Sequence, residues 1–177
     1  FRMGIQTITM PNVAGGSAVL DDDAAGIVAN YQFNENVGLT AFWARPYNDN
    51  YGYKWDGKQG YQNYMDNMDM FAVLLPLTFD GVKVTPWAMY GFVGRDSFEN
   101  AGASGDQKKL LQGLLPLGVS NKTLTGNSLT DRHGDAWWAG FTTELKVLDP
   151  FRFALDATYG RVDLGEGLST KGKKIDV

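Results

Sequence analysis

The stretch AGIVANYQFNENVGLTAFWAR, residues 25–45, decides the fold of this chain. Apolar side chains occupy every second position on each side of its centre: Ala25, Ile27, Ala29, Tyr31 and Phe33, then Val37, Leu39, Ala41 and Trp43. Strict alternation is typical of β-strands that place one apolar face against a non-aqueous environment. Only Asn34-Glu35-Asn36 separates the two runs, and these residues suit a hairpin turn. The stretch therefore predicts two antiparallel strands.

The same pattern recurs along the rest of the chain. Two further hairpins are expected, residues 69–79 with 82–94 through an Asp80-Gly81 turn, and residues 136–147 with 151–162 through residues 148–150. The first ten residues add one more alternating run, which gives about seven strands. No amphipathic helix of useful length competes with these strands.

The lengths of the connections indicate the architecture. Three links are tight, and they alternate with long segments at residues 11–24, 46–68, 95–135 and 163–177. Short turns at one rim and long loops at the other are typical of an up-and-down membrane barrel. A β-sandwich more often contains a Greek-key crossover. The predicted fold class is therefore all-β, an antiparallel up-and-down transmembrane β-barrel, with residues 1–177 as a single domain.

Composition permits this fold and excludes others. The chain is 44% hydrophobic and 13% aromatic, and its mean hydropathy is -0.26. Its longest apolar run, Met70–Phe79, contains Pro76 and is shorter than the roughly 20 residues of a spanning helix. A net charge of -4 argues against nucleic acid as a partner, because phosphate binding needs clustered cations. There is no cysteine, and therefore no disulfide framework or thiolate metal site.

The two faces of the strands predict two environments. The apolar face is expected to contact membrane lipid, and its aromatic residues near the strand ends are typical of interfacial girdles. A one-sided soluble sheet that buries this face remains the alternative. The candidate pore-lining residues on the opposite face are Asn30, Gln32, Thr40, Lys83, Thr85, Glu144, Lys146, Arg152 and Asp156. Trp87 and Met89 share that face, which indicates that an infolded loop covers part of it.

The segment 95–135 is too long for a simple connection. Its centre is apolar and contains the candidate constriction residues Leu110, Leu111, Leu114 and Leu115. We expect it to fold into the lumen as a constriction or to pack against a neighbouring subunit. An external loop packed on itself is the alternative.

Residues that could support catalysis or metal binding are few. The run Asp21-Asp22-Asp23 lacks the spacing of a calcium loop, so a solvated charge run is favoured. His133 is the only histidine and has no Ser elbow or Cys to accompany it. The aromatic stretch 47–64 could stack on sugars, although a role in stabilising the loop or a trimer contact is favoured. We therefore predict a protein that is not an enzyme, with no catalytic residue, metal or cofactor.

Three segments also resemble a known family. They are FRMGIQTITMPN (residues 1–12), DDDAAG (residues 21–26) and YQFNENVGLTAFWARPYND (residues 31–49). Together they resemble the outer-membrane homotrimeric porins of sulfate-reducing bacteria. The resemblance implies a homotrimer of pores that passes small hydrophilic, in part anionic, solutes. About seven strands are fewer than such a barrel needs, and the final residues KGKKIDV lack a terminal aromatic, so we expect an internal portion of a longer chain.

The sequence therefore predicts a porin of the bacterial outer membrane. It would form a water-filled channel for passive diffusion of small hydrophilic solutes and ions, with membrane lipid and two further copies as its partners. Two alternatives remain open: a soluble carbohydrate-binding β-sandwich module, and a substrate-specific outer-membrane transporter that saturates with its ligand.

Overall fold

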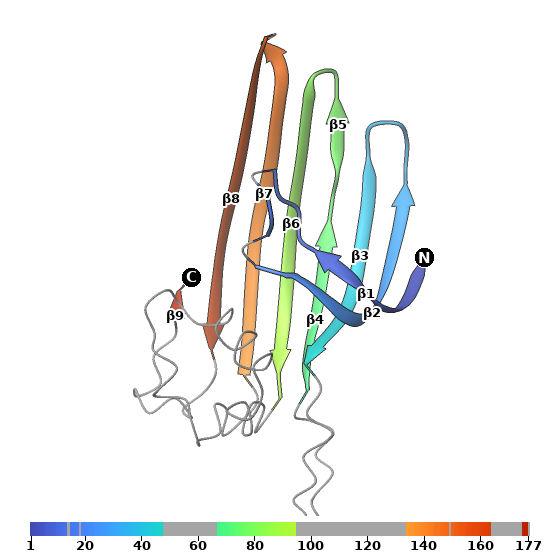
Figure 1. Cartoon of the computed structure of the whole chain (residues 1–177), viewed down its shortest axis with the longest axis vertical. Helices are drawn as coiled ribbons and strands as arrows, with labels where there is room; N and C mark the ends of the chain where they lie inside the picture. Colours follow the sequence, from blue (N-terminus) through green and yellow to red (C-terminus); the bar gives the residue numbers. More distant parts are fainter. Residues whose placement is uncertain are drawn as a thin grey trace, which may run out of the picture. The chain divides into compact units, whose positions relative to one another are not determined.

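A computed structural model describes residues 1–13, 15–17, 19–47, 67–94, 134–148, 150–163 and 175–176 of the chain. Every regular element in this part of the chain is a β-strand (Figure 1). The strands are β1 (Arg2–Thr9), β2 (Asp21–Gln32), β3 (Gly38–Tyr47), β4 (Met68–Leu74), β5 (Leu77–Phe79), β6 (Val82–Val93), β7 (Gly134–Leu148), β8 (Phe151–Asp163) and β9 (Ile175–Asp176). The all-β prediction is confirmed, and each of the seven expected strands is present.

The strands form one antiparallel sheet in the order β1-β2-β3-β4-β6-β7-β8-β9, and β5 pairs with β6. Strands that follow one another along the chain are therefore neighbours, as the alternation of short and long connections predicts, except that β4 and β5 both pair with β6. The three tight turns lie together at one end of the sheet, which we call the turn end (Figure 1). The sheet is not closed, because its path through the described strands begins at β1 and stops at β9.

Strand β2 begins four residues earlier than the sequence predicts. The acidic run that was expected to lie in a solvated loop continues the strand and pairs with β1, where Asp23 lies opposite Thr7 and Asp21 opposite Thr9. The Thr7 hydroxyl donates to Asp23 Oδ1 at 2.5 Å, and the Thr9 hydroxyl donates to Asp21 Oδ1 at 2.8 Å. Cross-strand bonds of this kind offset the low strand propensity of aspartate.

The expected strand 69–79 is interrupted at Leu75 and Pro76 and appears as β4 and β5. A proline has no N–H to donate to the ladder, so strands commonly break beside one. The remaining backbone groups keep the chain in place, since Gly38 N donates to Pro76 O at 2.9 Å and Leu75 N donates to Pro86 O at 3.0 Å. The two-residue β9 was not predicted, because so short an element has no periodicity to detect.

The chain divides into two compact units. The first comprises Phe1–Pro46, Met70–Tyr90 and Trp137–Gly160, and it contains the three hairpin turns and most of the sheet. The second comprises Tyr47–Asp69, Gly91–Ala136 and Arg161–Val177. In its described part Gly94 N donates to Asn67 O at 2.9 Å, and Met68, Val93, Ala136 and Val162 are buried.

The Asp80-Gly81 turn depends on its glycine. Gly81 has a φ of +67°, and a Cβ there would lie 2.5 Å from Val147 Cγ1 and 3.3 Å from Val147 N. We expect Gly81→Ala to lower the free energy of unfolding by about 1–2 kcal/mol, because the left-handed conformation strains any residue with a Cβ. Urea unfolding measures this change. Lys83→Ala, at the exposed second residue of β6, is the control. Its free energy of unfolding should stay within about 0.5 kcal/mol of that of the unmodified protein.

Candidate functional site

One face of the sheet exposes large apolar side chains, and we call it the aromatic face. Its sixteen exposed large hydrophobic residues among those described are Phe1, Met3, Ile5, Tyr31, Phe33, Phe71, Val73, Phe79, Tyr90, Trp137, Phe141, Val147, Phe151, Phe153, Leu155 and Tyr159. Their exposed fractions run from 38% at Trp137 to 84% at Ile5. They occupy alternate positions along each strand, so they form a continuous surface rather than scattered side chains.

Aromatic side chains concentrate toward both ends of this face. At the turn end, the rings of Tyr31 and Phe33 pack edge to face with centroids 4.9 Å apart. At the opposite ends of β7 and β8, the rings of Trp137 and Tyr159 pack similarly at 5.5 Å. On β3, the Arg45 guanidinium lies 5.5 Å from the centroid of the Trp43 ring. Aromatic residues at the two ends of an apolar strand face are typical of strands whose outer face lies in a membrane.

Small side chains lie between the two aromatic ends. A shallow groove of about 550 Å³ crosses β2, β3, β4 and β6 on the aromatic face. Its lining includes Ala29, Ala41 and Ala88, with larger side chains such as Trp43, Phe71 and Tyr90 beside them. Because residues of four strands line one groove, the alternating positions of these strands share a face as the sequence predicts.

The opposite face, which we call the mixed face, holds all nine candidate pore-lining residues. On the described strands it is defined by the positions that alternate with the aromatic face: even-numbered residues of β1, β2, β3, β4, β7 and β8, and odd-numbered residues of β6. Asn30, Gln32, Lys83, Lys146, Arg152 and Asp156 are exposed, and Thr40, Thr85 and Glu144 are half-buried. All nine lie in the part of the sheet nearer the turn end, so the structure brings them together on one polar surface.

Hydrogen bonds hold part of this polar surface in place on β2 and β3. Asn30 and Thr40 are directly opposite each other in the ladder, and the Thr40 hydroxyl donates to Asn30 Oδ1 at 2.7 Å. Gln32 Nε2 donates to the backbone carbonyl of Val37 at 3.1 Å and also to that of Asn34. These amide and hydroxyl groups have fixed positions without being buried.

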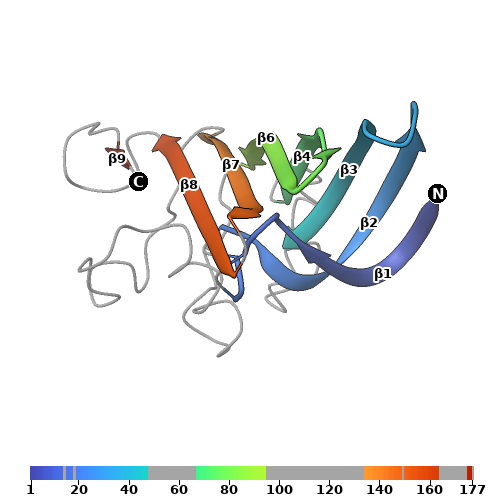
Figure 2. The ribbon, with the colours of Figure 1, turned by 90° about the horizontal axis from the view of Figure 1, so that it is seen from above.

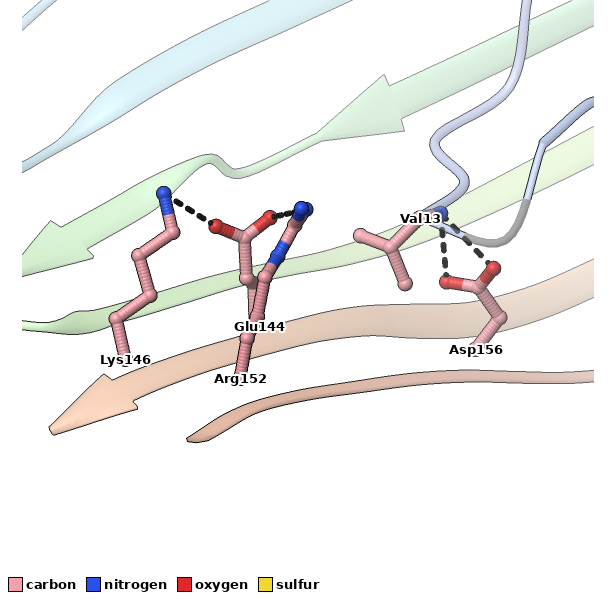
Figure 3. Close-up of polar contacts among 5 residues, drawn as sticks. All are labelled: Val13, Glu144, Lys146, Arg152 and Asp156. Atoms are coloured by element: carbon pink, nitrogen blue, oxygen red, sulfur yellow. Dashed lines mark hydrogen bonds and ion pairs between the residues drawn. The ribbon is translucent and has the colours of Figure 1, made fainter. Parts of the chain in front are cut away.

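On β7 and β8 the surface is charged. Glu144 accepts from Lys146 Nζ at 2.9 Å and from Arg152 Nη2 at 2.5 Å, and all three side chains point to the same side of the hairpin (Figure 3). The Glu144 side chain is 12% exposed, whereas those of Lys146 and Arg152 are 56% and 60% exposed. Two cations against one carboxylate leave a net charge of +1, with the cationic groups toward solvent. Such a cluster gives this part of the surface a local positive field.

Asp156 makes the longest-range contact of the mixed face. The backbone N–H of Val13, in the connection between β1 and β2, donates to Asp156 Oδ1 at 3.1 Å and to Oδ2 at 2.9 Å (Figure 3). The carboxylate of a strand far along the chain therefore binds a backbone group of the first connection. The sequence predicts Asp156 on this face but gives no sign of its partner.

Further from the turn end, the mixed face is apolar and buried. In the first unit the buried hydrophobic residues of its strands and of the connection between β1 and β2 are Ile8, Met10, Leu20, Ala24, Val28, Phe42, Ala44, Met70, Ala72, Trp87, Met89 and Trp138, and the polar Thr142 is buried with them. Trp87 and Met89 are 6% and 2% exposed, which agrees with the expectation that part of this face is covered, and the Trp87 ring packs against Gly140 of β7. The mixed face is thus divided along the strands into a polar part and a packed part, a division that the sequence does not predict.

Tryptophans and glycines pair across strands in the packed part. The Trp87 ring on β6 lies over Gly140 on β7, and the Trp138 ring on β7 lies over Gly160 on β8. A Cβ at Gly140 would be 2.8 Å from Trp87 Cζ2, and one at Gly160 would be 2.1 Å from Trp138 Cδ1. Each indole therefore occupies the space that a side chain at the neighbouring glycine would fill.

Other predicted features lie outside the described residues. These are residues 95–133 of the segment 95–135, with its candidate constriction residues Leu110, Leu111, Leu114 and Leu115, and residues 48–64 of the aromatic stretch 47–64. His133 lies outside the described residues as well, whereas Gly134 and Asp135 begin β7, two residues earlier than the sequence predicts. Within the described ranges, no three His, Cys, Asp or Glu side chains are grouped so that they could hold a metal ion. The same ranges contain no helix of the length and hydropathy needed to span a membrane.

Comparison with known protein families, with characterised proteins and with solved structures finds no match to this chain.

Proposed function

We propose that this chain is part of the wall of an outer-membrane porin, a water-filled channel through which small hydrophilic solutes and ions diffuse passively. The observation behind the proposal is the exposure of the aromatic face, together with a polar surface on the mixed face behind it. In this reading the aromatic face contacts lipid, and the polar part of the mixed face contacts the water of the pore.

The size of the exposed apolar surface supports this proposal. Sixteen large hydrophobic side chains, each 38% to 84% exposed, amount to on the order of 1,500 Å² at the usual area of such side chains. Soluble monomers rarely expose contiguous apolar patches of more than a few hundred Å². A carbohydrate-binding sandwich would bury this face against a second sheet, and the described strands form a single sheet.

The strand lengths and the charges of the mixed face agree with a pore wall. β2 and β6 have 12 residues, β8 has 13 and β7 has 15, whereas a tilted strand needs about 9–11 residues to cross the hydrocarbon core. Lys146 and Arg152 are exposed on the mixed face, beside the half-buried Glu144. Charged side chains are tolerated there in a wide barrel, because its interior is filled with water.

Single-channel recording tests the proposal. The full-length parent protein, reconstituted in a planar bilayer, is expected to give ohmic conductance steps, and flux of small solutes should rise in proportion to concentration. Closure in three equal steps would support the homotrimer that the family resemblance implies. A parent protein that stays dissolved without detergent and gives no steps would contradict the proposal. Saturable flux of one solute would instead favour the substrate-specific transporter.

A further inference from the structure

The connection between β1 and β2 comprises residues 10–20, and we call it the strap. Its described residues, 10–13, 15–17, 19 and 20, cross the mixed face (Figure 1). Its two ends are closed together, because Met10 N donates to Leu20 O at 2.9 Å. Both of these residues are buried, Met10 at 0% and Leu20 at 5% exposure. Between them, Val13 N is bound by the carboxylate of Asp156. The strap is therefore packed at its base and tied to β8 at its far side.

This tie requires a strongly curved sheet. Six strand spacings separate β1 from β8, which in a flat sheet would be about 29 Å. The three residues from Met10 to Val13 span at most about 11 Å. In a flat sheet, Val13 would therefore lie too far from β8 to contact Asp156. The sheet must curl with the mixed face inside. Figure 2 shows this, with β1 and β2 curving beneath β3 and β4 toward the side of β7 and β8.

The strap lies where the two parts of the mixed face meet. Arg152 and Glu144 are on the turn-end side of Asp156, and their charged groups are beside it on the same side of the hairpin (Figure 3). On the other side of Asp156 along β8, Thr158 is still exposed, and the following mixed-face residues Gly160 and Val162 are buried. The strap thus lies close to the boundary between the polar and the packed parts.

We propose that residues 10–20 narrow the passage along the mixed face and that the Asp156 carboxylate anchors them there. This inference rests on the proposed pore. It assigns the narrowing to the first connection of the chain, independently of residues 95–135. Asp156 acts as a positioning residue, because it holds the Val13 backbone and not the solute.

The local structure of the strap suits a fixed element. Gly15 and Gly16 have φ angles of +96° and +85°, which reverse the chain just after Val13. Gly16 N donates to Asn12 Oδ1 at 3.1 Å, and the Ser17 hydroxyl oxygen accepts from Val19 N at 3.2 Å. Side-chain oxygens thus satisfy the backbone donors of a segment that has no strand partner.

Two measurements on the full-length protein test the anchor and the narrowing separately. The first is hydrogen exchange of the amides in residues 10–20. Asp156→Ala should accelerate exchange at Val13 by roughly ten- to a hundredfold, the factor that corresponds to losing a hydrogen bond to a charged group. Asp156→Asn keeps one acceptor oxygen, so most of the protection should remain. Thr158→Ala, at the next mixed-face position of β8, is the matched control and should leave exchange unchanged.

The second measurement is single-channel conductance of the same variants. Asp156→Ala should increase conductance more than Asp156→Asn does, although both remove the same charge. Equal increases would assign the effect to charge and overturn the anchor. Unchanged exchange at Val13 in Asp156→Ala would also overturn it. Faster exchange at Val13 in Asp156→Ala with unchanged conductance would overturn the proposal that residues 10–20 narrow the passage. In another outcome, neither the unmodified protein nor any variant conducts, while protection of the Val13 amide still depends on Asp156. That result would contradict both the pore and its narrowing and would support only the contact between Val13 and Asp156.

Discussion

An arginine in place of Ala88 is expected to lower the free energy of unfolding by about 2–4 kcal/mol, the cost of a cation facing lipid near the middle of a membrane strand. Ala88 is exposed on the aromatic face and lines its groove, with aromatic side chains toward both ends of the face. If that face contacts lipid, the guanidinium has no water to hydrate it. If the face contacts water, an exposed arginine costs almost nothing.

Two control variants make this experiment decisive. Ala88→Leu fills the same groove without a charge and should change stability by less than about 0.5 kcal/mol. Thr85→Arg adds the same charge on the same strand but on the mixed face, where we expect a small effect if that face lines the proposed water-filled pore. The measurement is guanidinium unfolding of the full-length protein refolded into lipid vesicles. Equal stabilities of Ala88→Arg and Thr85→Arg would remove the lipid-facing assignment.

Adding a methyl group at Gly140 is expected to have the second large effect. A Cβ there would lie 2.5 Å from the carbonyl oxygen of Ala157, as well as 2.8 Å from the Trp87 ring. The carbonyl belongs to the adjacent strand, so it cannot move without disturbing the ladder. We expect Gly140→Ala to lower the free energy of unfolding by about 1–3 kcal/mol, as overpacking in a close-packed region does. Ala154→Ser, at an exposed mixed-face position of β8, is the control and should be nearly neutral.

Gly160 provides a sharper test of the same packing. The nearest atoms to a Cβ at Gly160 all belong to the Trp138 indole, whereas at Gly140 a backbone oxygen is nearest. Trp138→Ala should therefore relieve much of the cost of Gly160→Ala, with an interaction energy above about 1 kcal/mol in a double-mutant cycle. Trp87→Ala should not relieve Gly140→Ala to the same extent. Additive effects in both cycles would show that the indoles do not fill the space over the glycines.

Alternation made most of the fold predictable. The positions of Tyr31 and Trp43 on one face, and of Asn30 and Thr40 on the other, follow from a period of two and a three-residue turn. The same reasoning placed all nine candidate pore-lining residues on one face, because the face of a strand residue depends only on whether its position along the strand is odd or even. It misjudged Asp21–Asp23, since their strand pairing depends on the threonines of β1.

What could not be predicted depends on register and on distant contacts. The fit of Trp138 over Gly160 requires knowing which residues of two strands are neighbours, and alternation does not fix that. The bond between Val13 and Asp156 joins residues 143 positions apart, and the donor is a backbone group that no side-chain pattern marks.

The bond between Val13 and Asp156 also constrains the order in which the molecule assembles. Closing a loop of 143 residues costs conformational entropy before any contact is gained, whereas each hairpin closes over only a few residues. The donor and the acceptor are 143 residues apart, so we expect this contact to form after the hairpins, whose strands are close in sequence. Protection of the Val13 amide is therefore a late event in folding. The time at which the Val13 amide becomes protected therefore reports when the curved sheet is complete.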